Sequence, residues 1–195
     1  MSACYTVEEL EQLGIRTGRN PLIHRTVVFF NPRNIVLGHN VRIDCFSMLS
    51  AGADGIQIGR NVHIAPSSLI FGGGGAVVLS DFSGLSARVS LFTATDDYSE
   101  GYLTNPTVPE RYKKVKRGQV ILERHALVGT GSTLLPGVTL GRGSTVGAMS
   151  LVHTDVGEFE VVFGVPFRVI GRRDRNRLLE FEKAYLENEG RVENE

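Results

Sequence analysis

The sequence contains no tryptophan, only two cysteines and no excess of either charge, because 21 basic side chains balance 21 acidic ones. A neutral chain lacks the broad basic surface that non-specific nucleic-acid binding requires. No run approaches the roughly 20 apolar residues that cross a bilayer, and the first residues lack the basic start and apolar core of a signal peptide. Cys4 and Cys45 make no metal or redox spacing. We therefore expect a cytoplasmic protein without a bound metal, a membrane span or a nucleic-acid partner.

Glycine is abundant instead, with 23 residues, and aliphatic residues recur at a step of six. Two short interruptions lengthen the step to nine, and one long break follows Leu91. A step of six fits neither a helix of 3.6 residues per turn nor simple strand alternation. It fits a coil with three short sides, each turning one aliphatic residue inward, so that stacked coils form apolar columns. The inward positions are Leu37, Ile43, Leu49, Ile58, Ile64, Ile70, Leu79, Leu85, Leu91, Leu122, Val128, Leu134, Leu140, Val146 and Val152.

This ladder, from Leu37 to about Arg172, resembles the hexapeptide repeat of the left-handed parallel β-helix acyltransferases. The resemblance, and not the spacing, implies the left hand of the coil. We predict an all-β fold in a single domain, with the left-handed parallel β-helix over residues 35–172. Residues 1–34 are expected to form an amino-terminal cap, and residues 173–195 a carboxy-terminal helix and tail.

Two helices are predicted outside the ladder. Thr6 followed by Glu9 makes a capping box, which predicts a short helix over residues 6–13. A second helix is predicted over residues 174–189, packed on the coil or on a neighbouring subunit, with its charged face in solvent. Its apolar stripe consists of Leu178, Leu179, Phe181, Tyr185 and Leu186.

The long break predicts a loop over residues 92–120 that leaves the solenoid, because it holds Gly101, Pro106 and Pro109. The family resemblance implies that such a loop carries the catalytic base. Where galactoside-type members have a histidine, this chain has Asp96, followed by Asp97. A carboxylate with a pKa of about 3.9 is a weak base at neutral pH unless burial raises its pKa. Base and sugar-binding roles both stay open for Asp96, and Asp97 is expected to orient or bind the acceptor.

Two histidines are alternative candidates for the base, because an unperturbed imidazole titrates near pH 7. His63 lies in a coil before the break, next to the inward Ile64, where it could face the acceptor. His125 lies in the first coil after the loop, near the point where the chain returns.

The segment after the break resembles the coenzyme-A half of galactoside, maltose and xenobiotic acetyltransferases. The matching runs are Val128-Gly129-Thr130, Leu135-Pro136-Gly137-Val138, Val146-Gly147-Ala148 and Gly164-Val165-Pro166. The resemblance implies acetyl-CoA as co-substrate, with its pantetheine arm against Gly129, Thr130, Gly147 and Ala148. It implies phosphate contacts by Arg168 and Arg172, since guanidinium groups bind phosphate as forks. His153-Thr154 stands where the family has a Thr-Lys pair, and belongs to the same predicted site.

The predicted function is therefore an acetyl-CoA-dependent acetyltransferase that modifies an amino or hydroxyl group of a sugar. The acceptor is expected to be a sugar or a nucleotide-linked sugar in surface-polysaccharide synthesis, modified by direct transfer with a general base. Family resemblance also implies a homotrimer in which the loop reaches the adjacent subunit. Two alternatives stay open: a zinc enzyme like the β-helical carbonic anhydrases, which a metal assay would identify, and a non-catalytic β-helix scaffold, which would not bind CoA.

Overall fold

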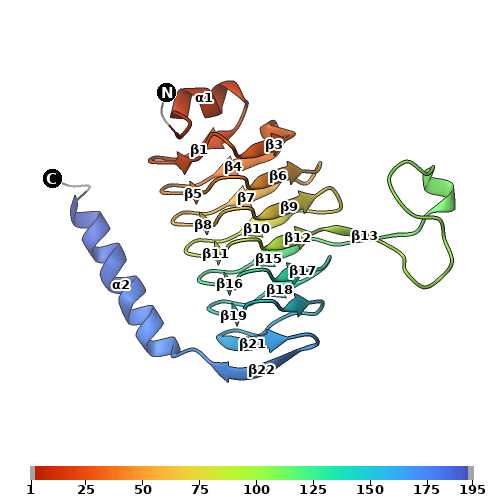
Figure 1. The fold of residues 1–195 in the computed structure, drawn as a ribbon. Helices are drawn as coiled ribbons and strands as arrows, with labels where there is room; N and C mark the ends of the chain where they lie inside the picture. The colour runs from red at the N-terminus through yellow and green to blue at the C-terminus, as the bar shows by residue number, and fades with distance from the viewer. Residues whose placement is uncertain (1–2, 193–195) are drawn as a thin grey trace.

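Three parallel sheets form the sides of a prism in the computed structural model, which describes residues 3–192 (Figure 1). Face 1 contains β1 (Arg16–Thr17), β4 (Ile35–Leu37), β7 (Ile56–Ile58), β10 (Val77–Leu79), β15 (Val120–Leu122) and β18 (Thr139–Leu140). Face 2 contains β2 (Leu22–Ile23), β5 (Arg42–Ile43), β8 (His63–Ile64), β11 (Gly84–Leu85), β16 (Leu127–Val128), β19 (Thr145–Val146), β21 (Glu160–Gly164) and β22 (Phe167–Arg172). Face 3 contains β3 (Val28–Phe30), β6 (Met48–Ala51), β9 (Leu69–Gly72), β12 (Ser90–Phe92), β17 (Thr133–Leu134) and β20 (Leu151–Val152).

The predicted left-handed parallel β-helix is confirmed, and its ladder is the core. All fifteen predicted inward residues are at most 3% exposed. They stack in register from coil to coil, as Ile43 does on Ile64 and Leu85 on Val128. Each coil turns from one face to the next at a corner, and we name the corners by the faces they join. Left-handed backbone recurs at these corners, for example at Asn40 and Asn61 with φ of 56°. Asparagine tolerates that conformation better than other residues with a side chain.

The solenoid begins one coil earlier than the sequence predicts, so the boundary at residue 34 is wrong. Strands β1, β2 and β3 form a first coil, in which Thr17 pairs with Leu37 and Phe29 with Leu49. A polar and an aromatic residue at inward positions hide this coil from an aliphatic pattern. The 3-10 helix η1 (Pro32–Asn34) also lengthens the step before β4.

The amino-terminal segment covers the start of this first coil. Helix α1 (Val7–Gln12) has the predicted capping box, in which Thr6 and Glu9 each accept a hydrogen bond from the other's backbone amide. Leu10 of α1 is fully buried in the core. Before the helix, Cys4 pairs with His24 in an antiparallel bridge at the end of β2.

The chain leaves the solenoid after β12 and returns at β15, as the sequence predicts for residues 92–120. The excursion is a hairpin of β13 (Ala94–Asp96) and antiparallel β14 (Val115–Arg117), with the 3-10 helix η2 (Glu110–Tyr112) before β14. It projects sideways from the corner between faces 3 and 1 (Figure 1). Gly74 allows this, because a Cβ there would lie 2.3 Å from the carbonyl oxygen of Thr93 at the hairpin base.

Helix α2 (Arg175–Val192) is confirmed near its predicted bounds, and Tyr185 of its predicted stripe packs on Phe82 of the coil. Its charged side docks on the corner between faces 1 and 2, where the Glu182 side chain is only 8% exposed. Phe181, from the predicted apolar stripe, is 64% exposed. The expected solvation holds for Lys183 and Glu187, but Glu182 and Glu189 dock instead, because arginines on the corner supply partners for them. No helix among residues 3–192 has the length and apolar character needed to span a membrane.

Candidate active site

The corner between faces 2 and 3 gathers most of the predicted coenzyme-A residues. Gly129 and Gly147 occupy equivalent places in successive coils, and each amide donates to the coil below at 2.7 Å. A Cβ on Gly147 would lie 2.2 Å from Cδ2 of Phe163, so only glycine lets the closing hairpin β21–β22 pack here. Thr130 and Ala148 follow these glycines at the same corner. The smallness that the sequence indicates therefore serves close packing between coils.

The β21–β22 hairpin brings one further predicted residue, Arg168, to this corner. The amide of Gly164 donates to Oγ of Ser150 at 2.9 Å, which ties the turn to the corner. Phe167 meets the His153 ring edge-on, with 5.6 Å between ring centroids. Arg168 lies opposite Phe163 in the hairpin register. Arg168 therefore lies close to the glycine corner, whereas His153 and the exposed Thr154 follow β20 at the other edge of face 3.

Arg172 does not belong to this group. It lies at the other end of β22, where its Nη2 donates to Oε1 of Glu160 at 3.0 Å. Five residue steps separate it from Phe167, a span of about 16 Å. Within one chain, Arg172 therefore lies away from the glycine corner, and its exposed guanidinium pairs with Glu160.

Asp96 lines a cavity of about 600 Å³ between the projecting hairpin and face 3. One of its carboxylate oxygens, Oδ2, accepts a hydrogen bond from the Asn105 amide at 3.1 Å. The hydroxyls of Thr95 and Tyr98 form a 2.6 Å hydrogen bond at the same cavity. The opposite wall comes from the solenoid itself, through Phe92, Thr133 and Leu135. The hairpin thus places two carboxylates, Asp96 and Glu110, beside a space large enough for a small ligand, and Glu110 pairs with Lys113 at 3.0 Å.

Asp97 has a different environment from its neighbour. Its Oδ2 accepts from the Glu100 amide at 2.7 Å, and Oδ1 accepts from Oγ of Ser99 at 3.4 Å. These bonds cap the turn that follows β13. The geometry therefore supports a role for Asp97 in shaping the loop.

His63 lies on the outer side of face 2, with half of its side chain exposed. Its Nε2 is 2.8 Å from Oδ2 of Asp44, whose Oδ1 accepts from Nε of Arg42 at 2.7 Å. Burial acts to raise the pKa of Asp44, but hydrogen bonds from Arg42 and His63 outweigh it and hold this pKa below its usual value. His63 is thus accessible on the surface, as its predicted role requires. The ion pair between Arg42 and Asp44 beside it was not predicted.

His125 is not near the hairpin, contrary to the expectation from its sequence position. It lies on the corner between faces 1 and 2, where α2 covers it and leaves 10% of its side chain exposed. Its Nε2 is 3.2 Å from Oε2 of Glu182, and its ring stacks on Phe82 at 5.0 Å. Burial lowers the pKa of His125, although the Glu182 contact opposes this. A residue under the helix does not meet a substrate, so its candidacy as a base is withdrawn.

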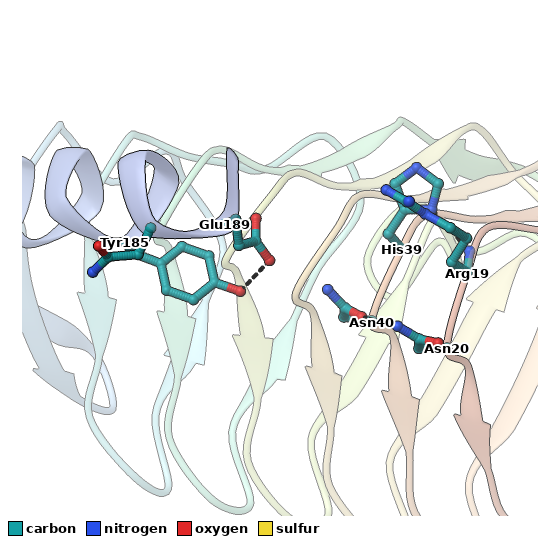
Figure 2. A pocket seen from close by; sticks show the side chains of 7 residues that line it. Arg19, Asn20, His39, Asn40, Tyr185 and Glu189 are labelled. Atoms are coloured by element: carbon teal, nitrogen blue, oxygen red, sulfur yellow. Dashed lines mark hydrogen bonds between the residues drawn. The ribbon is translucent and has the colours of Figure 1, made fainter. Parts of the chain in front are cut away.

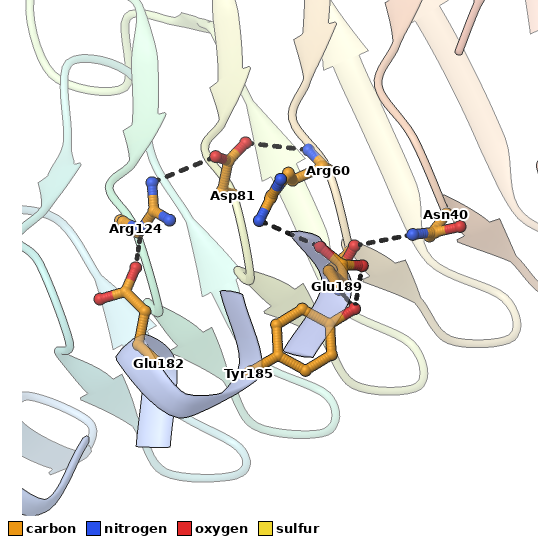
Figure 3. A network of polar contacts seen from close by, with 8 residues as sticks. Asn40, Arg60, Asp81, Arg124, Glu182, Tyr185 and Glu189 are labelled. Atoms are coloured by element: carbon orange, nitrogen blue, oxygen red, sulfur yellow. Dashed lines mark hydrogen bonds and ion pairs between the residues drawn. The ribbon is translucent and has the colours of Figure 1, made fainter. Parts of the chain in front are cut away.

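The polar network that docks α2 is the main feature that the sequence did not reveal (Figure 3). Arg124 bonds both Asp81, at 3.2 Å, and the Glu182 carboxylate. Further along the helix, Arg60 pairs with Glu189 at 3.3 Å. The network is confined to the corner between faces 1 and 2, so it positions the helix.

Beyond this network, a pocket of about 410 Å³ lies between α2 and the first coils (Figure 2). An asparagine ladder lines it, in which Asn20 donates to Asn40 at 3.2 Å and Asn40 donates to Asn61 at 3.2 Å. Asn61 in turn donates to the Tyr185 hydroxyl of α2 at 2.6 Å. The amides bond one another along the corner, so we assign this pocket no chemical role. Among residues 3–192, no three His, Cys, Asp or Glu side chains gather as a possible metal site.

Within one chain, the candidate groups lie in three places. The small residues with Arg168 occupy the corner between faces 2 and 3, His63 lies on face 2, and Asp96 lies at the hairpin beyond face 3. A single subunit therefore does not assemble all of them at one point. A hexapeptide-type solenoid with a projecting hairpin and a small-residue corner is the class of protein that these features define.

The comparisons with known proteins agree with this class. No family model matches the chain. It is 39% identical over 178 residues to the dTDP-4-amino-4,6-dideoxy-D-glucose acyltransferase of Escherichia coli, covering 91% of this chain and 92% of that protein. The chain belongs to the hexapeptide-repeat family of sugar acyltransferases.

Solved structures show the same likeness. AntD, an N-acyltransferase from Bacillus cereus in complex with dTDP and 3-hydroxybutyryl-CoA, is 37% identical, with a TM-score of 0.91 over 97% of this chain and all of AntD. An AntD variant in which an aspartate is replaced by asparagine, in complex with dTDP and coenzyme A, has a TM-score of 0.90 at 37% identity, over 96% of this chain and 100% of that one. A maltose O-acetyltransferase from Clostridium difficile, at 18% identity and a TM-score of 0.58 over 86% of this chain and 74% of that one, shares the fold.

Proposed function

We propose that this protein transfers an acyl group from acyl-CoA to the amino group of a nucleotide-linked sugar. The observation that carries the proposal is the end-to-end match to the E. coli dTDP-amino-sugar acyltransferase, together with the glycine corner and the Asp96 cavity. AntD, solved with dTDP and coenzyme A, supports both substrate classes. Two cysteines that form no disulfide, Cys4 and Cys45, support a reducing, cytoplasmic setting for the reaction.

The corner between faces 2 and 3 is proposed to hold the coenzyme. The pantetheine arm is placed along the solenoid axis beside this corner, past Gly147 and Gly129. Exposed apolar side chains at Met149 and Val165, 70% and 66% exposed, offer contact area for the adenine or the arm. Arg168 on β22 supplies a guanidinium for the phosphates.

The active site is proposed to form between subunits of a homotrimer. The hairpin and the coenzyme corner lie on opposite edges of face 3, so a neighbouring hairpin completes the site better than the subunit's own. Face 3 and its edge expose Val28, Phe30 and Phe46, which are 49%, 52% and 67% exposed. Exposed apolar patches of this kind mark protein interfaces.

Asp96 is proposed to bind the acceptor's amino group and to accept its proton. The neutral amine attacks the thioester carbonyl, the carbon–nitrogen bond forms and the carbon–sulfur bond breaks. The proton leaves the nitrogen for Asp96 and is passed to the departing thiolate, so coenzyme A leaves as the thiol. An amine suits a carboxylate base, since a neutral amine is already a good nucleophile. The presence of an aspartate variant among the AntD structures is consistent with this role.

A thiol-release assay tests the proposal. We expect turnover with dTDP-4-amino-4,6-dideoxyglucose and an acyl-CoA, and none with the matching 4-hydroxy sugar. Asp96→Asn should lower kcat by about 100-fold or more, the range of a general base. Asp54→Asn, at an exposed turn, is the matched control. Equal turnover of the hydroxy sugar, or full activity of Asp96→Asn, would contradict the proposed chemistry.

A further inference from the structure

The outer side of face 2 carries an ion cluster of Arg42, Asp44 and His63 that the proposed reaction does not use. Asp44 is 19% exposed, and each of its two oxygens contacts a different side chain, Arg42 at 2.7 Å and His63 at 2.8 Å. Arg42 and His63 are 56% and 50% exposed. The carboxylate therefore holds both side chains in place while about half of each stays accessible.

This cluster differs from the other arginine clusters in its accessibility. The arginines under α2 are covered by the helix and meet three carboxylates, those of Asp81, Glu182 and Glu189. On face 2, one carboxylate holds both an arginine and a histidine on an open surface. A fixed guanidinium beside an imidazole is suited to phosphate, which accepts several hydrogen bonds.

The strand column beside the cluster leaves room for a ligand. Arg42, His63, Gly84 and Leu127 follow one another on successive strands of face 2. Gly84 places no side chain between His63 and Leu127, and a Cβ there would find its nearest neighbours at 3.5 Å. A bound molecule can therefore lie directly against the backbone next to His63.

The position of the cluster along the solenoid fits the acceptor and not the coenzyme. The proposed coenzyme site starts at Arg168 near the carboxy-terminal end, and its pantetheine arm extends past Gly147 and Gly129 toward earlier coils. His63 lies two strands beyond Leu127 in the same direction, about 10 Å at the usual strand spacing. An acceptor that meets the end of a pantetheine arm placed in this way would lie on that side.

We propose that Arg42 and His63, held in place by Asp44, bind the diphosphate of the nucleotide-linked acceptor. This inference rests on the proposed function, since it assigns the part of the acceptor that does not react. It makes the cluster responsible for selecting nucleotide-linked over free amino sugars, because the free sugar has no phosphate to bind.

The test compares two acceptors: the nucleotide-linked amino sugar and the same amino sugar without its nucleotide. Arg42→Gln and His63→Gln should each lower kcat/KM for the nucleotide-linked sugar by about 10- to 100-fold, the range of a hydrogen bond to a charged group. The loss should appear in KM, and the free sugar should react as before. Arg42→Lys should recover part of the loss, and Arg16→Gln, at an exposed position on face 1, should change neither acceptor.

An equal loss with both acceptors would overturn the inference, because it would mean that the cluster supports the fold or the reacting centre. Unchanged selectivity in both variants would overturn it as well. Binding of thymidine diphosphate, measured by calorimetry, separates this result from a failure of the proposed function. One outcome is that the wild-type protein shows no turnover but still binds thymidine diphosphate, with at least tenfold weaker binding in Arg42→Gln. That result would refute the proposed acyl transfer and support the proposed phosphate site. If the two proteins bind thymidine diphosphate equally, the phosphate site fails.

Discussion

Replacing Glu182 with glutamine is the sharpest test of how α2 is held on the solenoid. The carboxylate is 8% exposed and contacts Arg124, His125 at 3.2 Å and Arg142 at 2.9 Å. Removing one partner of a buried ion pair costs about 3–5 kcal/mol. Both arginines are about one-third exposed and Arg124 keeps Asp81, so we expect a smaller loss, about 2 kcal/mol. For a chain of this length, that lowers Tm by about 4–8 °C.

Hydrogen exchange shows which part of the chain the Glu182→Gln substitution destabilises. The amides of α2 should exchange faster in Glu182→Gln, while those of the inner strands keep their protection, because solenoid coils contact only their neighbours. Glu187→Gln is the matched control on the same helix, since Glu187 is 59% exposed and 3.9 Å from Lys183. It should change the unfolding free energy by less than about 0.5 kcal/mol. Unchanged exchange in α2 of Glu182→Gln would refute the assignment of the network as the anchor of the helix.

The stability of the folded protein should fall in acid, because of the pKa values of His125 and Glu182. Burial lowers the pKa of His125 below 6.5, so the unfolded chain takes up this proton first and stability falls as the pH drops below about 6.5. The pKa of Glu182 is also lowered: burial opposes the shift, but hydrogen bonds from His125 and Arg124 outweigh it. Its contribution is therefore lost below about pH 4.5. His125→Gln should remove the upper part of this pH dependence, as measured by denaturant unfolding between pH 4 and 8.

Three other substitutions test the core and the coenzyme corner. Leu85→Ala, at a position 1% exposed, should lower the unfolding free energy by about 2–5 kcal/mol in urea. Gly147→Val should displace the β21–β22 hairpin, since a Cβ already meets Phe163 at 2.2 Å, and calorimetry should show loss of coenzyme-A binding. Arg168→Gln should weaken the binding of coenzyme A about tenfold and leave the binding of pantetheine, which has no phosphate, unchanged. This comparison distinguishes a phosphate contact from a packing role.

The repeat of aliphatic residues was enough to predict the solenoid, because a constant step of six places every inward side chain at the same point of its coil. Ile43 and Leu85 are then buried by their partners in the adjacent coils, such as Ile64 and Val128. The first coil escaped the pattern because Thr17 and Phe29 occupy two of its rungs. The hairpin within residues 92–120 also could not be predicted, since its pairing of Asp96 with Val115 follows no repeat.

Contacts between coils and with α2 are the part of the site that the sequence conceals. His63 and Asp44 are 19 residues apart, and they meet because Arg42 pairs with His63 in a coil of 21 residues. That coil length, once recognised, is a signal that would have found the pair. Glu182 and Arg124 are 58 residues apart and belong to different elements, so their contact depends on the docking angle of the helix. No local pattern encodes that angle.

The two ends of the prism are closed by chain running in the opposite direction to the strands. At one end Cys4 pairs antiparallel with His24, and at the other β22 lies antiparallel to β21. A parallel stack with bare ends would offer the same rows of amides and carbonyls to every other copy, and such edges template fibre growth. The antiparallel segments at the two ends interrupt the parallel register of the strands. The length of the particle is therefore set by its terminal segments, and a chain without them would be expected to polymerise end to end.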